Sequence, residues 1–206
     1  MRITLSAVSK SFARETVIRD LSHVFEPGSR TAILGPNGSG KSTLLQVIAG
    51  SSIPTKGTVH HSLKGVVVDP EDVYRHISIA APYLSLYEDL SLREAIGIHS
   101  RFKPFRDKVP VKEIARIALL HDQLEKPVRN FSSGMKQRLK LVFAILSDTP
   151  LLLLDEPASN LDAHGIAWFK TLMQLHLEGR TLVVASNRQA EETFACTSIV
   201  EVTHFR

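Results

Sequence analysis

The chain has 206 residues, of which 43% are hydrophobic and 22% charged, and its formal net charge is +4. This composition is typical of a folded domain with a buried core and excludes a largely disordered chain. Lysine and arginine are spread along the sequence, which argues against nucleic acid as the main partner. The single cysteine, Cys196, excludes an intrachain disulfide, and the apolar runs are shorter than the ~18 residues that cross a bilayer. The nine histidines show no metal-ligand spacing, and His60-His61 is expected to be a surface pair.

The first third of the sequence predicts strands. Runs of β-branched and apolar residues bounded by turn residues indicate them. They lie at residues 3–5, 17–18, 23–25, 31–34, 57–59, 65–68 and 76–81. Pro27-Gly28 predicts a tight turn before the run at 31–34.

The middle of the sequence, from about residue 83 to 150, predicts helices instead. Ser91, with Glu94 three residues later, fits a capping box at the start of one helix. A second helix is predicted over residues 110–120 and a third after Ser132. Strands at 151–154, 181–185 and 198–202 then alternate with helical segments at 162–178 and 189–194. We therefore expect one α/β domain over residues 1–206, with a helical subdomain inserted at about 83–150.

A short segment after the predicted strand 31–34 fits the phosphate-binding pattern G-x-x-x-x-G-K-[ST]. A strand, a Gly-rich loop and a helix let backbone N–H groups and the positive helix end surround an anion. A chance match in a chain of this length is on the order of 1%. The segment therefore predicts binding of a nucleoside triphosphate. Its residues are Gly35, Pro36, Asn37, Gly38, Ser39, Gly40, Lys41, Ser42 and Thr43.

Two carboxylates follow the apolar run 151–154. Asp155 and Glu156 would stand at the carboxyl end of a strand buried on both faces, which is where ligands of α/β sheets bind. In phosphoryl transfer, the first carboxylate holds Mg²⁺ together with the loop hydroxyl, here Ser42, and the second is placed to orient the attacking water. An acidic strand end that only caps the next helix is the alternative, and the phosphate loop upstream argues against it.

A third segment, residues 130–138, begins a predicted helix with Ser132, Ser133 and Gly134. Its hydroxyls and backbone N–H groups could hold a second phosphate cluster. On physical grounds alone, an ordinary helix N-cap with a flexible glycine is the better interpretation.

Together these segments resemble the ATP-binding subunit of ABC transporters, over essentially the whole chain. Residues 131–135 stand where that family has its Leu-Ser-Gly-Gly-Gln signature, and 159–162 match the loop after its Walker B strand, which here ends in Asp155. Phe12 matches the aromatic residue that stacks on adenine, although a core phenylalanine is the alternative. The resemblance implies a P-loop NTPase core with a mixed sheet and an N-terminal antiparallel β part.

The resemblance also implies a mechanism and partners. Two subunits, identical or paralogous, would sandwich two ATP molecules head to tail and hydrolyse them with Mg²⁺. Each site would join the phosphate loop of one subunit, with catalytic Lys41 and Glu156, to the signature of the other. The motion would drive integral membrane subunits touched by the helical subdomain, from the cytoplasmic face of the cell membrane, with no nucleic acid involved. The nucleotide-binding residues implied outside the phosphate loop are Phe12, Ser132, Ser133, Gly134 and Asp162.

Two positions depart from the family pattern. The Gln that usually follows the strand before the helical insertion is absent, since that strand ends in Ala81-Pro82-Tyr83. The usual His after the last core strand is replaced by Asn187, whose amide can donate a hydrogen bond but cannot carry a positive charge. We therefore expect intact ATP binding and slow hydrolysis, with Glu156 carrying most of the catalysis.

Two alternatives stay open at this point. They are a regulatory module with little turnover and a soluble ABC ATPase outside transport. The sequence does not indicate the transported substrate, the direction of transport, or whether the pair of subunits is a homodimer or a heterodimer.

Overall fold

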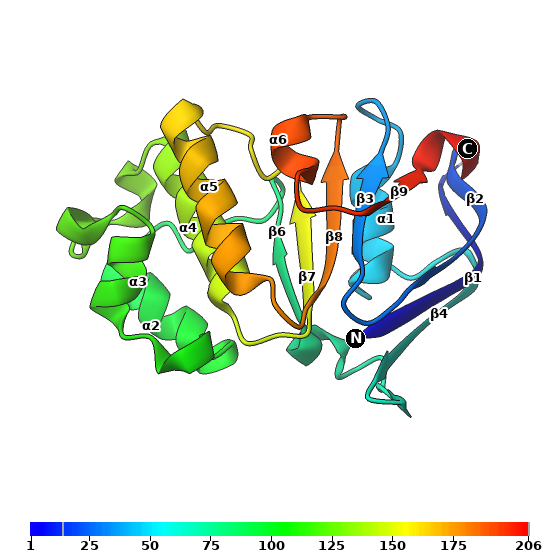
Figure 1. Ribbon diagram of the computed structural model, residues 1–206, viewed down its shortest axis with the longest axis horizontal. Coiled ribbons are helices and arrows are strands. Elements are labelled where there is room, and N and C mark those ends of the chain that lie inside the picture. The colour runs from blue at the N-terminus through cyan, green and yellow to red at the C-terminus, as the bar shows by residue number, and fades with distance from the viewer. Residues whose placement is uncertain (14, 206) are drawn as a thin grey trace. The chain divides into compact units, whose positions relative to one another are not determined.

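The computed structural model describes residues 1–13 and 15–205, which divide into two compact units. The first unit contains residues 1–79, 149–156 and 177–206, and the second contains 80–148 and 157–176. The strands belong to the first unit, except for Ala80 at the end of β6, and helices α2 to α5 belong to the second; Figure 1 labels these elements.

An antiparallel sheet of four strands contains the beginning of the chain. β1 and β2 form a hairpin that joins the short predicted runs into two long strands, with Phe12 opposite Glu15. Ile3 and Leu5 are buried with the period of two expected for a strand. Register shifts interrupt the pairing after Leu5. The order is β2-β1-β4-β5, with β1 Arg2–Phe12, β2 Glu15–Phe25, β4 Lys56–Leu63 and β5 Val66–Val67.

A second sheet of five strands brings together the ends of segments that are distant in the sequence. β3 runs parallel to β8 and β9, and β7 runs parallel to β8, so their carboxyl ends lie at one edge. At that edge Leu34 pairs with Ser186 and Asp155 pairs with Ala185. All residues of β7 and β8 are buried, as their continuous apolar runs predict. The order is β6-β7-β8-β3-β9, with β3 Arg30–Leu34, β6 Ile77–Ala80, β7 Leu151–Asp155, β8 Thr181–Ser186 and β9 Ser198–Glu201.

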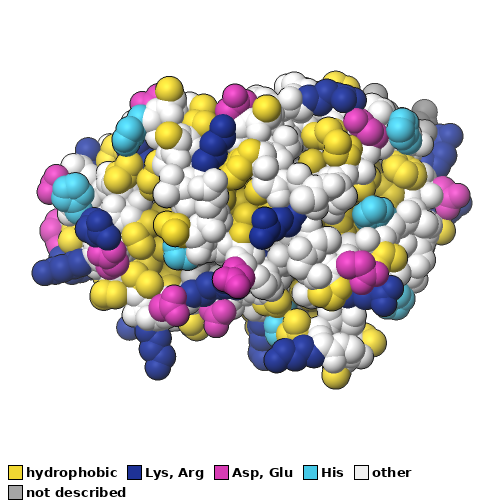
Figure 2. Space-filling model, in the orientation of Figure 1, with side chains coloured by type: hydrophobic (Ala, Val, Ile, Leu, Met, Phe, Trp, Pro, Cys, Tyr) yellow, Lys and Arg dark blue, Asp and Glu magenta, His cyan; other side chains and the backbone are white. Residues whose placement is uncertain are grey.

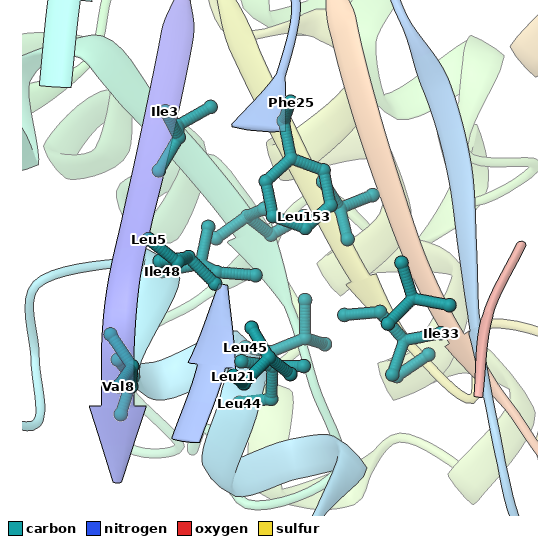
Figure 3. Packing of buried hydrophobic residues seen from close by; sticks show 14 of the residues in the cluster. Ile3, Leu5, Val8, Leu21, Phe25, Ile33, Leu44, Leu45, Ile48 and Leu153 are labelled. Carbon is teal, nitrogen blue, oxygen red and sulfur yellow. The ribbon is translucent and has the colours of Figure 1, made fainter. Parts of the chain in front are cut away.

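Helix α1, Lys41–Ile48, packs in the core of the first unit with residues from both sheets. Figure 3 shows Leu44, Leu45 and Ile48 of this helix among Ile3 of β1 and Ile33 of β3. Burying each such side chain stabilises the fold by about 1.5–3 kcal/mol. Because α1 follows the phosphate loop directly, this packing fixes the end of the loop. The remaining helical segments of this unit are short: Val73–His76, α6 Ala190–Thr193 and Val202–Phe205.

The second unit is built from helices. α2 begins with the predicted capping box, in which Ser91 N donates to Glu94 Oε2 at 2.8 Å and Glu94 N donates to Ser91 Oγ at 3.3 Å. The helix predicted over residues 110–120 is too long, because it ends at Ile117 and Leu119 adopts a positive φ of 57°. The long helices are α2 Leu92–Phe102, α3 Val111–Ile117, α4 Ser133–Leu146 and α5 Ala163–His176, with short 3₁₀ turns at Arg106–Lys108, His121–Gln123 and Val128–Asn130.

A stack of rings joins α2 to α4 inside the second unit. The His99 ring lies 4.3 Å from the Phe143 ring and 5.1 Å from the Phe105 ring, measured between centroids. Its Nε2 is 2.9 Å from Ser147 Oγ. Burial lowers the pKa of His99 to about 4, helped by the nearby positive charge of Lys103 and opposed by a backbone hydrogen bond with Phe143. The imidazole is therefore neutral at pH 7.

Candidate functional site

The phosphate loop connects β3 to α1, as the sequence predicts. Lys41 is 4% exposed, and its Nζ donates to the carbonyl oxygens of Gly35 at 2.9 Å and Pro36 at 3.0 Å. An ammonium group has three donors, so this arrangement holds Lys41 in place and leaves one donor for a phosphate oxygen. The loop is therefore shaped before any nucleotide binds.

Two glycines are required by the packing of this loop. A Cβ on Gly35 would come within 2.5 Å of Ser39 Oγ. Gly40 has a φ of +98°, and a Cβ there would lie 2.6 Å from Val17 Cγ1. A side chain at Gly40 would displace the backbone that must approach an anion, and one at Gly35 would force the buried Ser39 side chain to move. The pattern G-x-x-x-x-G-K-[ST] thus matches a physical need of this structure.

A hollow of about 320 Å³ lies over the phosphate loop in the first unit. Three parts of the sequence line it: the β1–β2 hairpin, the loop with α1, and the residue after β7. Its lining residues are Phe12, Glu15, Val17, Asn37, Gly38, Gly40, Lys41, Ser42, Thr43 and Glu156. Glu15 and Val17 were not predicted from the sequence as lining residues. The only sequence feature that points to them is that β2 begins three residues after Phe12. Phe12 is 50% exposed, so the alternative of a core phenylalanine is wrong.

Asp155, at the end of β7, is buried with unsatisfied oxygens. Asp155 is 1% exposed, and among the described residues neither of its carboxylate oxygens has a hydrogen-bond partner. Burial raises the pKa of Asp155, and Glu156 raises it further, while the nearby Ser42 hydroxyl and Lys41 lower it. Ser42 thus lies close to the carboxylate without reaching hydrogen-bond geometry with either oxygen.

These oxygens fit a divalent cation. Mg²⁺ binds hard oxygen ligands, usually one or two carboxylates or hydroxyls together with phosphate and water. A buried carboxylate without a partner is costly unless such a ligand satisfies it. Asp155 and Ser42 therefore offer the donor set that the sequence analysis assigned to Mg²⁺.

Glu156 has an unusual backbone conformation. Its φ is +45°, which is strained for a residue with a side chain, and its N–H donates to Ala185 O at 3.0 Å. It lines the hollow beside Lys41 and Ser42. Residues held in such conformations gather at functional sites, where surrounding structure imposes the strain.

The turn after β8 carries Asn187 at the same edge of the sheet. Asn187 is exposed, and it is absent from the described residues that line the hollow. Before it, the buried Ser186 hydroxyl donates to the buried carboxylate of Glu192 and accepts from Gln189 N at 3.1 Å. The sequence analysis missed Glu192, which α6 places against the end of β8.

In the second unit, the signature segment forms the start of α4. Ser132 is its N-cap, with Oγ accepting from Met135 N at 3.2 Å. A Cβ on Gly134 would lie 3.1 Å from Asn160 O, so this segment lies beside the loop after β7. Asp162 caps α5, its Oδ1 accepting from Gly165 N at 2.7 Å.

In the second unit, a lysine side chain contacts the backbone at the position where the family usually has a Gln. Lys140 Nζ donates to Ala81 O at 3.4 Å and to Pro82 O at 3.3 Å, while Tyr83 is 43% exposed. These contacts fix the backbone of the segment without supplying a side-chain amide.

Comparison with known proteins decides the family. The sequence profile described as ABC transporter matches residues 18–159. The chain belongs to this family. It is 30% identical, over 92% of its length, to the ABC transporter ATP-binding protein YcbN of Bacillus subtilis (strain 168), and spans 62% of that protein. The fold class and the resemblance predicted from the sequence are confirmed.

Solved ABC proteins have the same fold. A structure described as the ATP-binding subunit of an ABC transporter has a TM-score of 0.82 and 26% identity, covering 98% of this chain and 85% of the other. A dimeric structure of a bacterial ABC transporter cassette also has a TM-score of 0.82, at 22% identity, covering 98% of this chain and 95% of the other.

Other features of this ABC family member also bear on the expectations from the sequence. His61 is buried, 5% exposed, with Nε2 2.7 Å from Ile48 O, so the expectation of a surface pair is wrong for it. Burial raises the pKa of the Cys196 thiol to about 11, which makes it unreactive. Within residues 1–13 and 15–205, no cluster of three or more His, Cys, Asp or Glu could hold a metal by itself, and no helix is long and apolar enough to span a bilayer.

Charged side chains of both signs lie on the surface. Figure 2 shows the Lys and Arg side chains of one face separated by acidic, apolar and polar groups.

Proposed function

We propose that this chain is the ATP-binding and ATP-hydrolysing subunit of an ABC transporter. The observation that carries the proposal is the buried, unpartnered carboxylate of Asp155 beside the phosphate loop. Such a group is stabilised when a metal–nucleotide complex occupies the hollow. Family membership supports the same reading.

Binding is assigned to residues that line the hollow. The backbone N–H groups of the loop and the Lys41 ammonium bind the phosphates, and the exposed ring of Phe12 stacks on the base. Asp155 and Ser42 hold Mg²⁺, which when bound neutralises charge that develops on the phosphates. The remaining steps belong to groups of the protein.

Hydrolysis is assigned mainly to Glu156. Its carboxylate orients a water and accepts its proton as the water oxygen forms a bond to the γ-phosphorus. The bond from the γ-phosphorus to the bridging oxygen breaks, and ADP leaves with that electron pair. Lys41 stabilises the negative charge on the transferred phosphoryl oxygens.

We further propose that two subunits complete each site. Ser132, Ser133 and Gly134 would contact the nucleotide held by the phosphate loop of another copy or of a paralogue, with Asp162 close to them. The exposed start of α4 supports this, because its first N–H groups can bind an anion. The pair would act on integral membrane subunits from the cytoplasmic face of the cell membrane.

A second candidate is a regulatory module that binds ATP and hydrolyses it slowly. Two observations favour it. Lys140 holds the Ala81 and Pro82 carbonyls where the family has a Gln, and Asn187 has no ionisable side chain at the position of the usual His.

The proposal is tested by steady-state turnover of ATP with Mg²⁺ over a range of protein concentrations. We expect turnover per subunit to rise with concentration, since pairing completes the sites. Glu156→Gln should lower it by about 10²- to 10⁴-fold and leave ATP affinity intact. Glu71→Gln, an exposed acid in the same unit that does not line the hollow, is the matched control.

Each outcome separates the readings. If Glu156→Gln turns over ATP like the native chain, the assignment of the water-orienting residue is wrong. ATP binding with negligible turnover at every concentration would favour the regulatory module.

A further inference from the structure

A lysine that the proposed function does not use lies against the base-stacking residue. Lys10 and Phe12 are two positions apart on β1, and Lys10 Nζ lies 5.0 Å from the centroid of the Phe12 ring. That distance is within the range in which an ammonium is attracted to the negative face of an aromatic ring.

The ammonium is held in this position from its other side. Lys10 Nζ donates to the carbonyl oxygen of Ile53 at 2.7 Å. The same loop is tied to β1 by Thr55, whose N–H donates to Ser9 O at 2.8 Å and whose Oγ1 accepts from Ser11 N at 3.0 Å. Lys10 is therefore clamped between a fixed carbonyl and the ring.

Of these two side chains, Phe12 is the one that lines the hollow. Phe12 is among the residues that line the hollow and Lys10 is not, for the part of the chain that the structure describes. The ammonium lies over the ring, and the half-exposed ring itself lines the hollow over the phosphate loop.

We propose that Lys10 is a positioning residue for nucleotide binding: it fixes the Phe12 ring so that the free face can stack on the base. This inference rests on the proposed function, since it takes ATP as the ligand. An exposed phenylalanine loses side-chain freedom when a base stacks on it, which weakens binding. A ring already held by a cation has less freedom to lose. Lys10 is not among the described residues that line the hollow, so its ammonium is assigned to the ring and not to the phosphates.

The proposal predicts an effect that depends on the base. Lys10→Met keeps the length of the side chain and removes its charge. We expect the Kd of ATP to rise by about two- to fivefold, the effect of one cation–π contact at an exposed site. The Kd of inorganic tripolyphosphate, which has no base, should not change. Both constants are measured by calorimetric titration of the purified chain.

Three further variants make the test specific. Lys56→Met removes an exposed charge at the start of the neighbouring strand, opposite Ser9, and should leave both constants unchanged. Lys10→Arg keeps a cation and should restore ATP affinity. In a Phe12→Ala background, Lys10→Met should have no effect on ATP binding, because the ring through which Lys10 is proposed to act is absent.

The proposal is overturned if Lys10→Met binds ATP like the native chain, or if it weakens tripolyphosphate as much as ATP. An undiminished effect in the Phe12→Ala background also overturns it, because Lys10 would then act without the ring. Failure of the proposed function looks different, since the native chain would then bind neither ATP nor tripolyphosphate.

Discussion

The phosphate loop of the first unit and the signature segment of the second both precede a helix, yet they are built differently. Around the loop, some polar groups are buried without hydrogen-bond partners in residues 1–13 and 15–205, among them both Asp155 oxygens and Ser39 Oγ. At the signature segment Ser132 and Ser133 are exposed, although Arg138 Nε, further along α4, is buried without a hydrogen-bond partner among the described residues. Ser132 caps α4, and Gln137 Nε2 donates to Pro157 O at 2.9 Å.

This difference separates a site that needs a ligand from a surface that can do without one. Unsatisfied buried groups destabilise a fold unless binding compensates them. The phosphate loop is therefore a receptor that the chain forms alone. The serines of the signature segment are exposed, and Ser132 already caps α4, which agrees with the proposal that this segment acts only on nucleotide held by another subunit.

The largest expected effect concerns the loop. Lys41→Met removes a buried ammonium whose free donor is assigned to phosphate. Charged hydrogen bonds contribute about 1.5–3 kcal/mol each, so the Kd of ATP should rise about 10- to 100-fold. Titration with ATP checks this, and Lys136→Met near the signature segment should leave the Kd of the isolated subunit unchanged. Similar losses from both variants would erase the contrast between the two regions.

A smaller effect concerns the stability of the second unit in acid. The pKa of His99 is about 4 in the folded chain, below its ordinary value of 6.5, so the unfolded chain takes up the proton first as the pH falls. The contribution of neutral His99 to the free energy of unfolding is complete above pH 6.5 and is lost progressively toward pH 4. At pH 5 the loss for this group is about 2 kcal/mol. His99→Phe keeps the stack of rings and should remove that loss.

Urea unfolding at pH 7.5 and pH 5 measures the difference. The free energy of unfolding of the native chain should fall by about 2 kcal/mol more than that of His99→Phe. His61 in the first unit, whose pKa burial also lowers, titrates equally in both proteins and so cancels. An identical acid loss in the two proteins would show that His99 is not buried in its neutral form.

Next in size is the distinction between neighbouring serines of the signature segment. Ser132→Ala removes the N-cap of α4 and should cost about 1 kcal/mol of stability. Ser133→Ala leaves the cap intact and should not change stability, yet it should lower turnover if this hydroxyl faces the nucleotide of the partner. Thermal unfolding and ATP turnover of both variants give the answer. A stability loss for Ser133→Ala would indicate a purely structural role.

The smallest expected effect is at Asn187. Asn187→His supplies an imidazole beside the carboxyl end of β8, and we expect a rise in turnover of a few fold, within the range of a general acid–base contribution that is not fully aligned. ATP turnover measures it, with Asn187→Ala as the control for loss of the amide. No rise would mean that Asn187 does not limit the rate.

Much of the site could be predicted because local sequence sets both its backbone and its chemistry. The glycines, Lys41 and Ser42 of the loop and the carboxylates after β7 lie within short motifs flanked by recognisable strands and helices. Glu15 could not be found in this way, since its place beside Phe12 follows from the pairing of β1 with β2. His61 was misjudged because burial of a residue in β4 depends on α1 packing against it.

Tertiary contacts also determine where several strands and helices begin and end. The predicted runs at 3–5, 17–18 and 23–25 are parts of two paired strands of 11 residues each, because partners in the sheet extend a strand beyond its apolar residues. Helix α3 ended early at Ile117 because Leu119 turns into the left-handed region, which the apolar pattern does not signal.

The backbone of Glu156 has a consequence for how this protein can vary. Glycine adopts a φ of +45° without the steric cost that glutamate bears, so replacing Glu156 by glycine relaxes the chain at this point. The same replacement removes the carboxylate on which hydrolysis is proposed to depend. Selection for heat resistance and selection for turnover therefore act in opposite directions on one residue.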